Sequence, residues 1–338
     1  MSSKFFTQGQ AISFIEKAFD KGRQSNGGKN ISVTCPMCKA VKGPRYEKQK
    51  LVIRTDNFWV HCWVCGYKNR NIYRLLAKWA PDYLAEYKDS FLDAEELKAS
   101  EAEAKQVYKP IVLPTGYTLL ADAYARLSSL SSYQRRYTER ALEYLKERGI
   151  TTKAELWYWK FGITTFYKEG CKDRILIPSF DRSGTLNYWT GRSWRRQPKR
   201  KYNNPFCNRR EIIFNELNID WQEPLTIVEG PFDLLKCNEN ATCVLGSELT
   251  LEYELLQKIV KNQTPIILAF DPDKEGQDKQ FALANRFLEF DIPVKIVEHR
   301  DKSKDVGDLT KSEFIDLLDS AKTYTTDYHL RRRIASIV

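Results

Sequence analysis

LTIVEGPFDLLKCNENATCVLG (residues 225–246) contains two short apolar runs separated by a more polar segment. Similar runs return in PIILAFD (265–271) and PVKIVEH (293–299), with helix-prone segments at 248–262 and 274–290 between them. Short apolar runs that alternate with helices are typical of parallel strands that are buried on both faces. The pattern predicts an α/β domain with a mostly parallel sheet, and helices over 231–240, 248–262, 274–290 and 311–322.

Acidic residues follow these predicted strands. Glu229 ends the first run, Asp271 and Asp273 follow the second, and Asp305 and Asp308 follow the third. The carboxyl ends of parallel strands meet at one edge of a sheet, so these side chains should converge. Clustered carboxylates repel one another unless cations hold them, and their oxygens suit Mg²⁺ or Mn²⁺. The pattern predicts metal-assisted phosphoryl or nucleotidyl transfer, with solvated acidic loops as the alternative.

Two neighbours of Glu229 belong to the same motif. Gly230 has no Cβ and would allow a close approach of backbone or metal. Asp233 either supports the metal site or places a favourable charge in the first turn of the following helix.

Two cysteine pairs lie near the start of the chain, Cys35-Pro-Met-Cys38 and Cys62-Trp-Val-Cys65. This spacing lets two turns complete a tetrahedral zinc shell, and four protein ligands make the zinc structural. The β-prone segments between the pairs favour a zinc ribbon. Disulfides or unrelated cysteines are the alternative, as is His61 in place of one cysteine ligand.

Aromatic residues crowd the second cysteine pair. These residues, Trp59, His61, Trp63 and Tyr67, either stack on single-stranded bases or pack the ribbon's small core.

Composition limits the class of protein. The chain has 338 residues, enough for two or three domains, and 54 basic against 44 acidic residues give a net charge of +10. That surplus favours an anionic partner such as nucleic acid. No run of 18 apolar residues occurs and the N-terminal segment lacks a signal peptide's apolar block, so no membrane span or leader is expected.

A basic segment precedes the acidic motifs. Residues 174–194 predict two strands around an Asp-Arg-Ser-Gly turn, and residues 191–210 then carry eight Arg and Lys and no acid. Trp194 and Tyr202 lie among these cations, which favours contact with a nucleic-acid strand over a solvated basic loop.

In combination, these motifs resemble a known family. Glu229-Gly-Pro-Phe-Asp233, Asp271-Pro-Asp273 and Lys304-Asp305-Val-Gly-Asp308 resemble the three signatures of a Toprim domain. The upstream cysteines, Lys172-Asp-Arg174, Thr190-Gly-Arg192 and Lys201-Tyr-Asn-Asn-Pro205 resemble DnaG-type primases, although the last segment is one residue shorter than the family's pattern. The compact order looks most like the stand-alone primases of T-even-like bacteriophages.

The resemblance implies an α+β multidomain fold. Its expected parts are a zinc-ribbon domain (1–90), a linker (91–110), a mixed α+β basic subdomain of the polymerase core (111–222), a Toprim subdomain (223–322) and a basic tail (323–338).

The resemblance also implies the activity, which is synthesis of short RNA primers on single-stranded DNA from ribonucleoside triphosphates. Glu229, Asp271 and Asp273 would bind catalytic Mg²⁺ or Mn²⁺, and Asp305 would support them. Arg174 and Lys201 would act at the catalytic centre, and with Arg192, Asn204 and Trp63 they would contact nucleotide or template.

The implied setting is the replication fork in the cytoplasm, the host's for a phage protein, with a separate hexameric helicase as partner. Two other functions stay open: another Toprim enzyme, such as a nuclease or a topoisomerase-like protein, and a non-catalytic zinc-ribbon adaptor that binds single strands.

Overall fold

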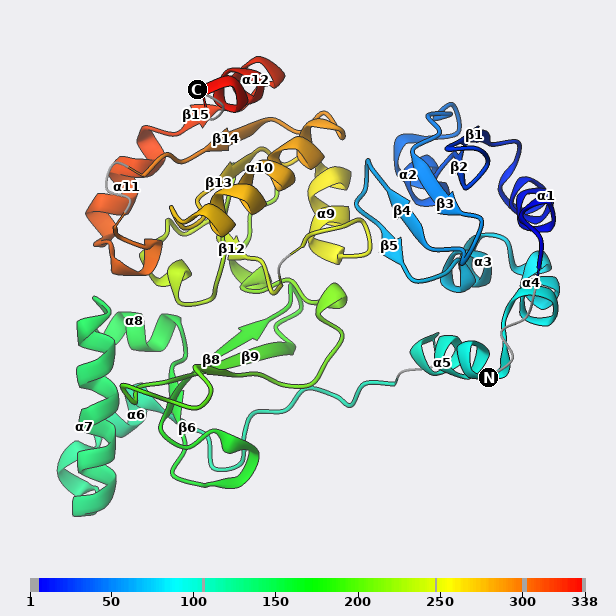
Figure 1. Cartoon of the computed structure of the whole chain (residues 1–338). Coiled ribbons are helices and arrows are strands. Elements are labelled where there is room, and N and C mark those ends of the chain that lie inside the picture. Colours follow the sequence, from blue (N-terminus) through cyan, green and yellow to red (C-terminus); the bar gives the residue numbers. More distant parts are fainter. Residues whose placement is uncertain (1–5, 105–106, 247, 300–302, 336–338) are drawn as a thin grey trace. The chain divides into compact units, whose positions relative to one another are not determined.

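The computed structural model describes residues 6–104, 107–246, 248–299 and 303–335 (Figure 1). It divides into two compact units, residues 1–108 with 249–261, and residues 109–248 with 262–338. Residues 105–106 of the predicted linker and 336–338 of the predicted tail lie outside the described residues. The domain boundaries expected from the sequence stay a prediction. None of the helices in the described ranges combines the length and apolar character needed to cross a bilayer.

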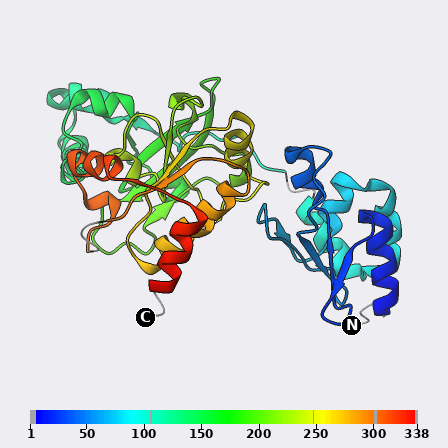
Figure 2. The ribbon, with the colours of Figure 1, turned by 90° about the horizontal axis from the view of Figure 1, so that it is seen from above.

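The first unit contains an antiparallel sheet in which the strands pair in chain order. The strands are β1 (Arg23–Ser25), β2 (Asn30–Val33), β3 (Leu51–Arg54), β4 (Val60–Cys62) and β5 (Lys68–Asn69). The helices are α1 (Gln8–Phe19), α2 (Pro36–Lys42), α3 (Tyr73–Trp79), the 3₁₀ turn η1 (Pro81–Tyr83), α4 (Leu84–Phe91), α5 (Ala94–Ala104) and α9 (Glu254–Asn262). Figures 1 and 2 both show α1 alongside this sheet.

Aromatic rings form much of the core of this unit. The Phe14 ring lies 4.9 Å from Phe91 and 5.7 Å from Tyr87, and the Phe58 ring lies 4.9 Å from Phe91 and 5.1 Å from Tyr87. Ring pairs at such distances contribute beyond their buried area. They connect α1, the turn after β3 and α4, so a small sheet gains a compact apolar support.

The second unit begins with another antiparallel meander, in the order β10-β9-β8-β7-β6. Its strands are β6 (Thr118–Leu119), β7 (Gly162–Ile163), β8 (Arg174–Phe180), β9 (Leu186–Ser193) and β10 (Tyr202–Asn203). The predicted Asp-Arg-Ser-Gly turn connects β8 and β9, since Asp181 accepts hydrogen bonds from Ser183 and Thr185. The accompanying helices are α6 (Leu120–Ala125), α7 (Ser132–Glu147) and α8 (Lys153–Tyr158), with 3₁₀ turns at Leu127–Ser129, Lys168–Gly170, Arg209–Glu211 and Glu216–Asn218.

The predicted parallel sheet completes this unit, in the order β12-β11-β13-β14-β15. Its strands are β11 (Leu225–Val228), β12 (Ala241–Cys243), β13 (Ile266–Leu268), β14 (Val294–Ile296) and β15 (Lys322–Thr323), of which only β15 is antiparallel to its neighbour. The connecting elements are η6 (Asp233–Lys236), α10 (Lys274–Leu288), η7 (Val306–Asp308), α11 (Lys311–Asp319) and α12 (Thr326–Ala335).

One prediction about this sheet is wrong. The segment 231–240 is not a helix; it contains only the short 3₁₀ turn η6. Only twelve residues, 229–240, return the chain from the end of β11 to the start of its parallel neighbour β12, and a regular helix does not fit in so short a crossover.

The two sheets of the second unit share one apolar core. Ile175 and Tyr188 from the meander belong to the same buried cluster as Val228, Phe232 and Ala269 from the parallel sheet. Because one packed interior connects them, the basic meander has a fixed position against the acidic strand ends.

Replacing Phe14 with alanine should destabilise the first unit by about 3–5 kcal/mol, because a ring that is 3% exposed would leave a cavity among four aromatic neighbours. The measurement is urea unfolding of the full chain. Phe206→Ala is the control, since Phe206 is 77% exposed. Equal effects of the two substitutions would contradict this packing.

Candidate active site

The four predicted zinc ligands lie together in the first unit. Their sulfur atoms all lie within 4.8 Å of one another, and Cys35–Cys65 and Cys38–Cys62 are 3.8 and 3.7 Å apart. A tetrahedron with zinc–sulfur bonds of about 2.3 Å has edges of about 3.8 Å, so the cluster fits one structural zinc ion. The cysteines are free and buried, which excludes the disulfide alternative in this structure.

His61 is not part of this cluster. Its ring lies on β4 between Trp59 and Trp63, at centroid distances of 5.8 and 4.3 Å. Trp63 is 68% exposed and Trp59 37%, whereas Tyr67 is buried in the core. The two tryptophans and His61 therefore form an accessible aromatic row, and only Tyr67 serves the packing role that the sequence left open.

The acidic residues of the second unit follow β11, β13 and β14. Glu229 comes directly after β11, and its Oε1 accepts a hydrogen bond from the Asp271 backbone N at 3.1 Å. Asp271 follows β13 by three residues, and its Oδ1 accepts from Val306 N at 3.1 Å. These two bonds join the three acidic motifs at one edge of the sheet, as their positions in the sequence predict.

The glycine that makes this approach possible is Gly276, in the first turn of α10. A Cβ there would lie 2.5 Å from Glu229 Oε1 and 2.6 Å from the Asp271 carbonyl oxygen. Gly276 N also donates to Asp273 Oδ1 at 2.6 Å, which caps the helix. At Gly230, by comparison, a Cβ would meet only Asp233 Oδ2 at 3.1 Å, so the tight position is Gly276.

Burial and mutual repulsion disfavour the charged forms of these acids. Burial raises the pKa of Glu229, and the Asp271 carboxylate raises it further. Burial also raises the pKa of Asp271, with Asp305 and Asp273 adding to the effect. Cations at this edge would restore the charged forms, which is the condition for divalent metal binding.

Asp233 connects two of the acidic loops. Its Oδ2 accepts from Gly230 N at 2.9 Å, and its Oδ1 lies 3.2 Å from the position of a Cβ on Gly307. Burial raises the pKa of Asp233 to about 7, and the Asp271 carboxylate adds to the shift. Of the two roles left open by the sequence, the contacts of Asp233 agree with support of the acidic site.

A pocket of about 360 Å³ brings acidic and basic segments together within the second unit. Glu229, Asp233 and Lys279 line it from the parallel-sheet side, and Thr190, Tyr202, Asn204 and Arg209 line it from the meander. Lys279 Nζ lies 3.6 Å from Glu229 Oε2, and Asn204 Oδ1 accepts from Thr190 Oγ1 at 2.8 Å. Predicted residues of both motifs thus share one cavity.

The remaining basic residues have different environments. Arg192 lies over the rings of Tyr202 and Phe232, at 5.2 and 5.0 Å, and donates to the Tyr202 hydroxyl. Lys201 is exposed.

Arg174 is buried, and its guanidinium donates to the backbone carbonyls of Gly170, Gly191, Arg200 and Lys201 at 2.9–3.1 Å. Arg174 therefore fixes the backbone of the basic segment through these hydrogen bonds. The phosphate contact expected of Arg174 stays a prediction.

Comparison with known proteins identifies the parallel-sheet region, because residues 223–298 match the family model described as Toprim domain. The chain contains a Toprim domain. It is 28% identical over 130 residues to a DNA primase of Listeria innocua, covering 35% of this chain and 20% of that protein. It is 29% identical over 164 residues to a DNA primase of Mycoplasma pneumoniae, covering 45% and 26%. The chain thus spans about a fifth to a quarter of the length of these relatives.

Solved structures are also similar. The zinc-binding and RNA polymerase domains of the Aquifex aeolicus primase match with a TM-score of 0.46 at 18% identity, covering 96% of this chain and 87% of that one. A DNA primase domain from Pseudomonas aeruginosa matches with a TM-score of 0.49 at 16% identity, covering 65% and 84%. The resemblance to DnaG-type primases agrees with the sequence relatives, while the likeness to phage primases stays a prediction.

Sequence reasoning gave no individual role to three residues of the Toprim site, although Gly276 lies in the second signature of the resemblance, which runs on from Asp273 as Lys-Glu-Gly-Gln. Lys279 pairs with Glu229, His299 Nε2 lies 2.8 Å from the Phe270 carbonyl oxygen beside Asp271, and Gly276 leaves space for Glu229. Only Gly276 had a local signal, because it lies three residues after the helix-capping Asp273. Lys279 and His299 reach the site through the path of α10 and β14.

Cys62→Ser should remove zinc and unfold the first unit, because a hydroxyl is a poor substitute for a thiolate ligand and so small a sheet depends on the metal. Zinc content by mass spectrometry and proteolysis of residues 1–108 are the measurements. Cys207→Ser, outside the cluster and half-buried, is the control. Full zinc occupancy in Cys62→Ser would contradict the ligand assignment.

Without added Mg²⁺ or Mn²⁺, Asp233 should make the protein less stable as the pH rises. Its folded-state pKa of about 7 lies above the ordinary value of 3.8, so the protonated form stabilises the fold fully below about pH 4, and this contribution is lost as the pH rises through 7. Asp233→Asn should therefore gain stability relative to the wild type between pH 5 and pH 8 in urea unfolding. An unchanged difference between the two proteins would contradict the shifted pKa.

Proposed function

We propose that this chain is a DNA primase, a DNA-directed RNA polymerase that joins ribonucleoside triphosphates on a single-stranded DNA template. The observation that carries the proposal is the shared pocket, which the acids Glu229 and Asp233 of the Toprim domain line together with Arg209 of the basic segment. A site for nucleotidyl transfer requires both halves, since carboxylates hold cations and basic residues bind phosphate. The similarity to proteins named DNA primase supports the choice among Toprim functions.

Glu229, Asp271 and Asp273 are the residues that would hold Mg²⁺ or Mn²⁺, with Asp305 beside them. Such ions neutralise charge on the triphosphate and lower the cost of bringing a hydroxyl oxygen to phosphorus. Asp271 is oriented by Val306 N and Asp273 by Gly276 N, so each keeps a fixed direction before any metal arrives. No protein nucleophile is needed for this reaction.

The basic residues have two roles in this proposal. Arg192, Lys201 and Asn204 contact the nucleotide or the template strand. Arg174 acts through the segment it holds, because its four carbonyl partners include Arg200 and Lys201. Lys279 partly offsets the burial and repulsion that raise the pKa of Glu229, since its ammonium lies 3.6 Å from that carboxylate.

The zinc unit is proposed to contact unpaired template bases. Trp59 and Trp63 present exposed rings directly before and after β4, and exposed aromatic rings stack on bases of any sequence. A separate hexameric helicase as partner, and action at the replication fork in the cytoplasm, rest on the primase resemblance alone.

Asp271→Asn with Asp273→Asn should lower primer synthesis about 10²-fold or more, because charge stabilisation at the reacting phosphate is lost. Labelled ribonucleotides, single-stranded DNA and Mg²⁺ are incubated with the protein, and products are sized on a gel. Binding of the template, followed by fluorescence anisotropy, should change less than about twofold, since these acids do not attract the strand.

Asp278→Asn is the matched control, because Asp278 is an exposed acid of α10, the helix that Asp273 caps. Synthesis retained by the double variant would overturn the metal role. Cleavage of the DNA in place of ribonucleotide incorporation would favour the nuclease or topoisomerase-like alternative, and binding without either reaction would favour the adaptor.

A further inference from the structure

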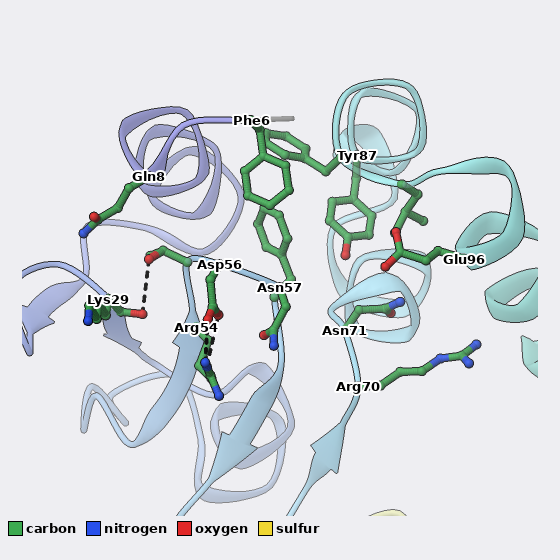
Figure 3. A pocket seen from close by; sticks show the side chains of 14 residues that line it. Phe6, Gln8, Lys29, Arg54, Asp56, Asn57, Arg70, Asn71, Tyr87 and Glu96 are labelled. Carbon is green, nitrogen blue, oxygen red and sulfur yellow. Dashed lines mark hydrogen bonds and ion pairs between the residues drawn. The ribbon is translucent and has the colours of Figure 1, made fainter. Parts of the chain in front are cut away.

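The chain orients acidic side chains in two different ways. In the first unit, Asp56 lies in the turn after β3, at a cavity of about 780 Å³ (Figure 3). The Arg54 guanidinium donates to both oxygens of Asp56, so a cation already compensates this carboxylate. Asp271 also follows a strand, but its Oδ1 accepts from a neutral group, Val306 N, at 3.1 Å. A neutral partner orients the carboxylate and leaves its charge available to a divalent cation.

Gln280 continues the sheet at the point where β13 and β14 end. The ladder between these strands reaches Val297 N, which donates to Leu268 O at 2.9 Å. Beyond that bond the side-chain amide of Gln280, from α10, bridges the two strand ends. Its Oε1 accepts from Phe270 N at 3.1 Å, and its Nε2 lies 3.5 Å from the Val297 carbonyl oxygen. Gln280 is fully buried, where an amide is stable only if its polar atoms are paired, so it fixes the backbone immediately before Asp271.

Two further side chains bind the carbonyl oxygens of this backbone. His299 Nε2 lies 2.8 Å from the Phe270 carbonyl oxygen, and Nε2 must be the donor because a carbonyl has no proton to donate. Gln277 Nε2 donates to the Asp271 carbonyl oxygen at 3.1 Å. Since Glu229 accepts from Asp271 N, every polar backbone atom of Phe270 and Asp271 has a side-chain partner. The direction in which the Asp271 carboxylate leaves the sheet is thus set largely by α10 and by the segment after β14.

We propose that Gln277, Gln280 and His299 are positioning residues, which raise the affinity of the acidic edge for a divalent cation by fixing the backbone of residues 270–271. A carboxylate that is already oriented loses less conformational freedom when the ion binds, and the partners of metal ligands commonly change metal affinity about 10- to 100-fold. The two glutamine amides do this without neutralising the carboxylate. The inference rests on the proposed function, in which Asp271 binds the metal.

Binding of Mn²⁺ to the full, zinc-loaded chain is measured by electron paramagnetic resonance, which detects the free ion. Asp271→Asn with Asp273→Asn should lose the ions bound at the acidic edge and so defines them. Gln280→Met and His299→Leu should each weaken the binding of these ions about tenfold, because each removes backbone partners while keeping a similar side-chain volume. His299→Gln should stay within about twofold of the wild type, because an amide nitrogen can replace Nε2 as the donor.

Gln222→Met is the matched control, because Gln222 is an exposed glutamine of the same unit and should leave Mn²⁺ binding unchanged. Urea unfolding without Mn²⁺ shows whether each variant is folded under the conditions of the binding measurement. If Gln280→Met does not fold, the comparison of His299→Leu with His299→Gln decides, since His299 is only half-buried. A purely structural role would lower the unfolding midpoint of His299→Leu and leave the Mn²⁺ affinity of the folded protein unchanged.

Primer synthesis gives a second readout. The Mg²⁺ concentration for half-maximal synthesis should rise about tenfold in His299→Leu, while the rate at saturating Mg²⁺ should change less than about threefold, because the bound ion itself restores the ligand geometry. Absence of primer synthesis in the wild type would contradict the proposed function and leave the Mn²⁺ result intact, so the two failures are distinguishable.

Three results would overturn the inference. They are wild-type Mn²⁺ affinity in both Gln280→Met and His299→Leu, equal weakening in His299→Leu and His299→Gln, and unchanged Mn²⁺ binding in Asp271→Asn with Asp273→Asn.

Discussion

The Toprim domain of this chain depends on the close approach of the Glu229 side chain to the backbone of Asp271. A single hydrogen bond of 3.1 Å joins the ends of two neighbouring parallel strands, and Gly276 leaves the space for it. The same contact concentrates negative charge, as the raised pKa values of Glu229 and Asp271 show. The fold thus creates an electrostatic cost that a divalent cation can remove, and this is why a metal-dependent function suits the site.

The function proposed for the basic meander depends on its position next to that acidic edge of the parallel sheet. Its residues share a buried core with the parallel sheet, so Asn204 and Tyr202 face Glu229 across a pocket of fixed shape. The buried Arg174 supports the meander, because its guanidinium donates hydrogen bonds to four backbone carbonyls. A basic segment rich in Arg and Lys would otherwise repel itself, and this internal support keeps it folded over the acidic motifs.

The zinc unit is a second, separately supported structure. Four sulfur atoms hold one end of its sheet, and a cluster of phenylalanine and tyrosine rings holds the other. These supports bury the phenylalanine and tyrosine rings and leave the tryptophans beside the metal exposed.

The sequence by itself determined the features that depend on local order along the chain. Cysteine spacing predicted the metal cluster, and acids placed directly after apolar runs predicted which edge of the sheet is charged, because strand direction fixes where the ends meet. It failed at 231–240, where the short crossover rather than the helical pattern decides the conformation. Only the tertiary structure decided the burial of Arg174, the close packing at Gly276 and the aromatic packing around Tyr87. Each of these depends on residues that are distant in the chain, and no local pattern records which side chains such distant segments bring together.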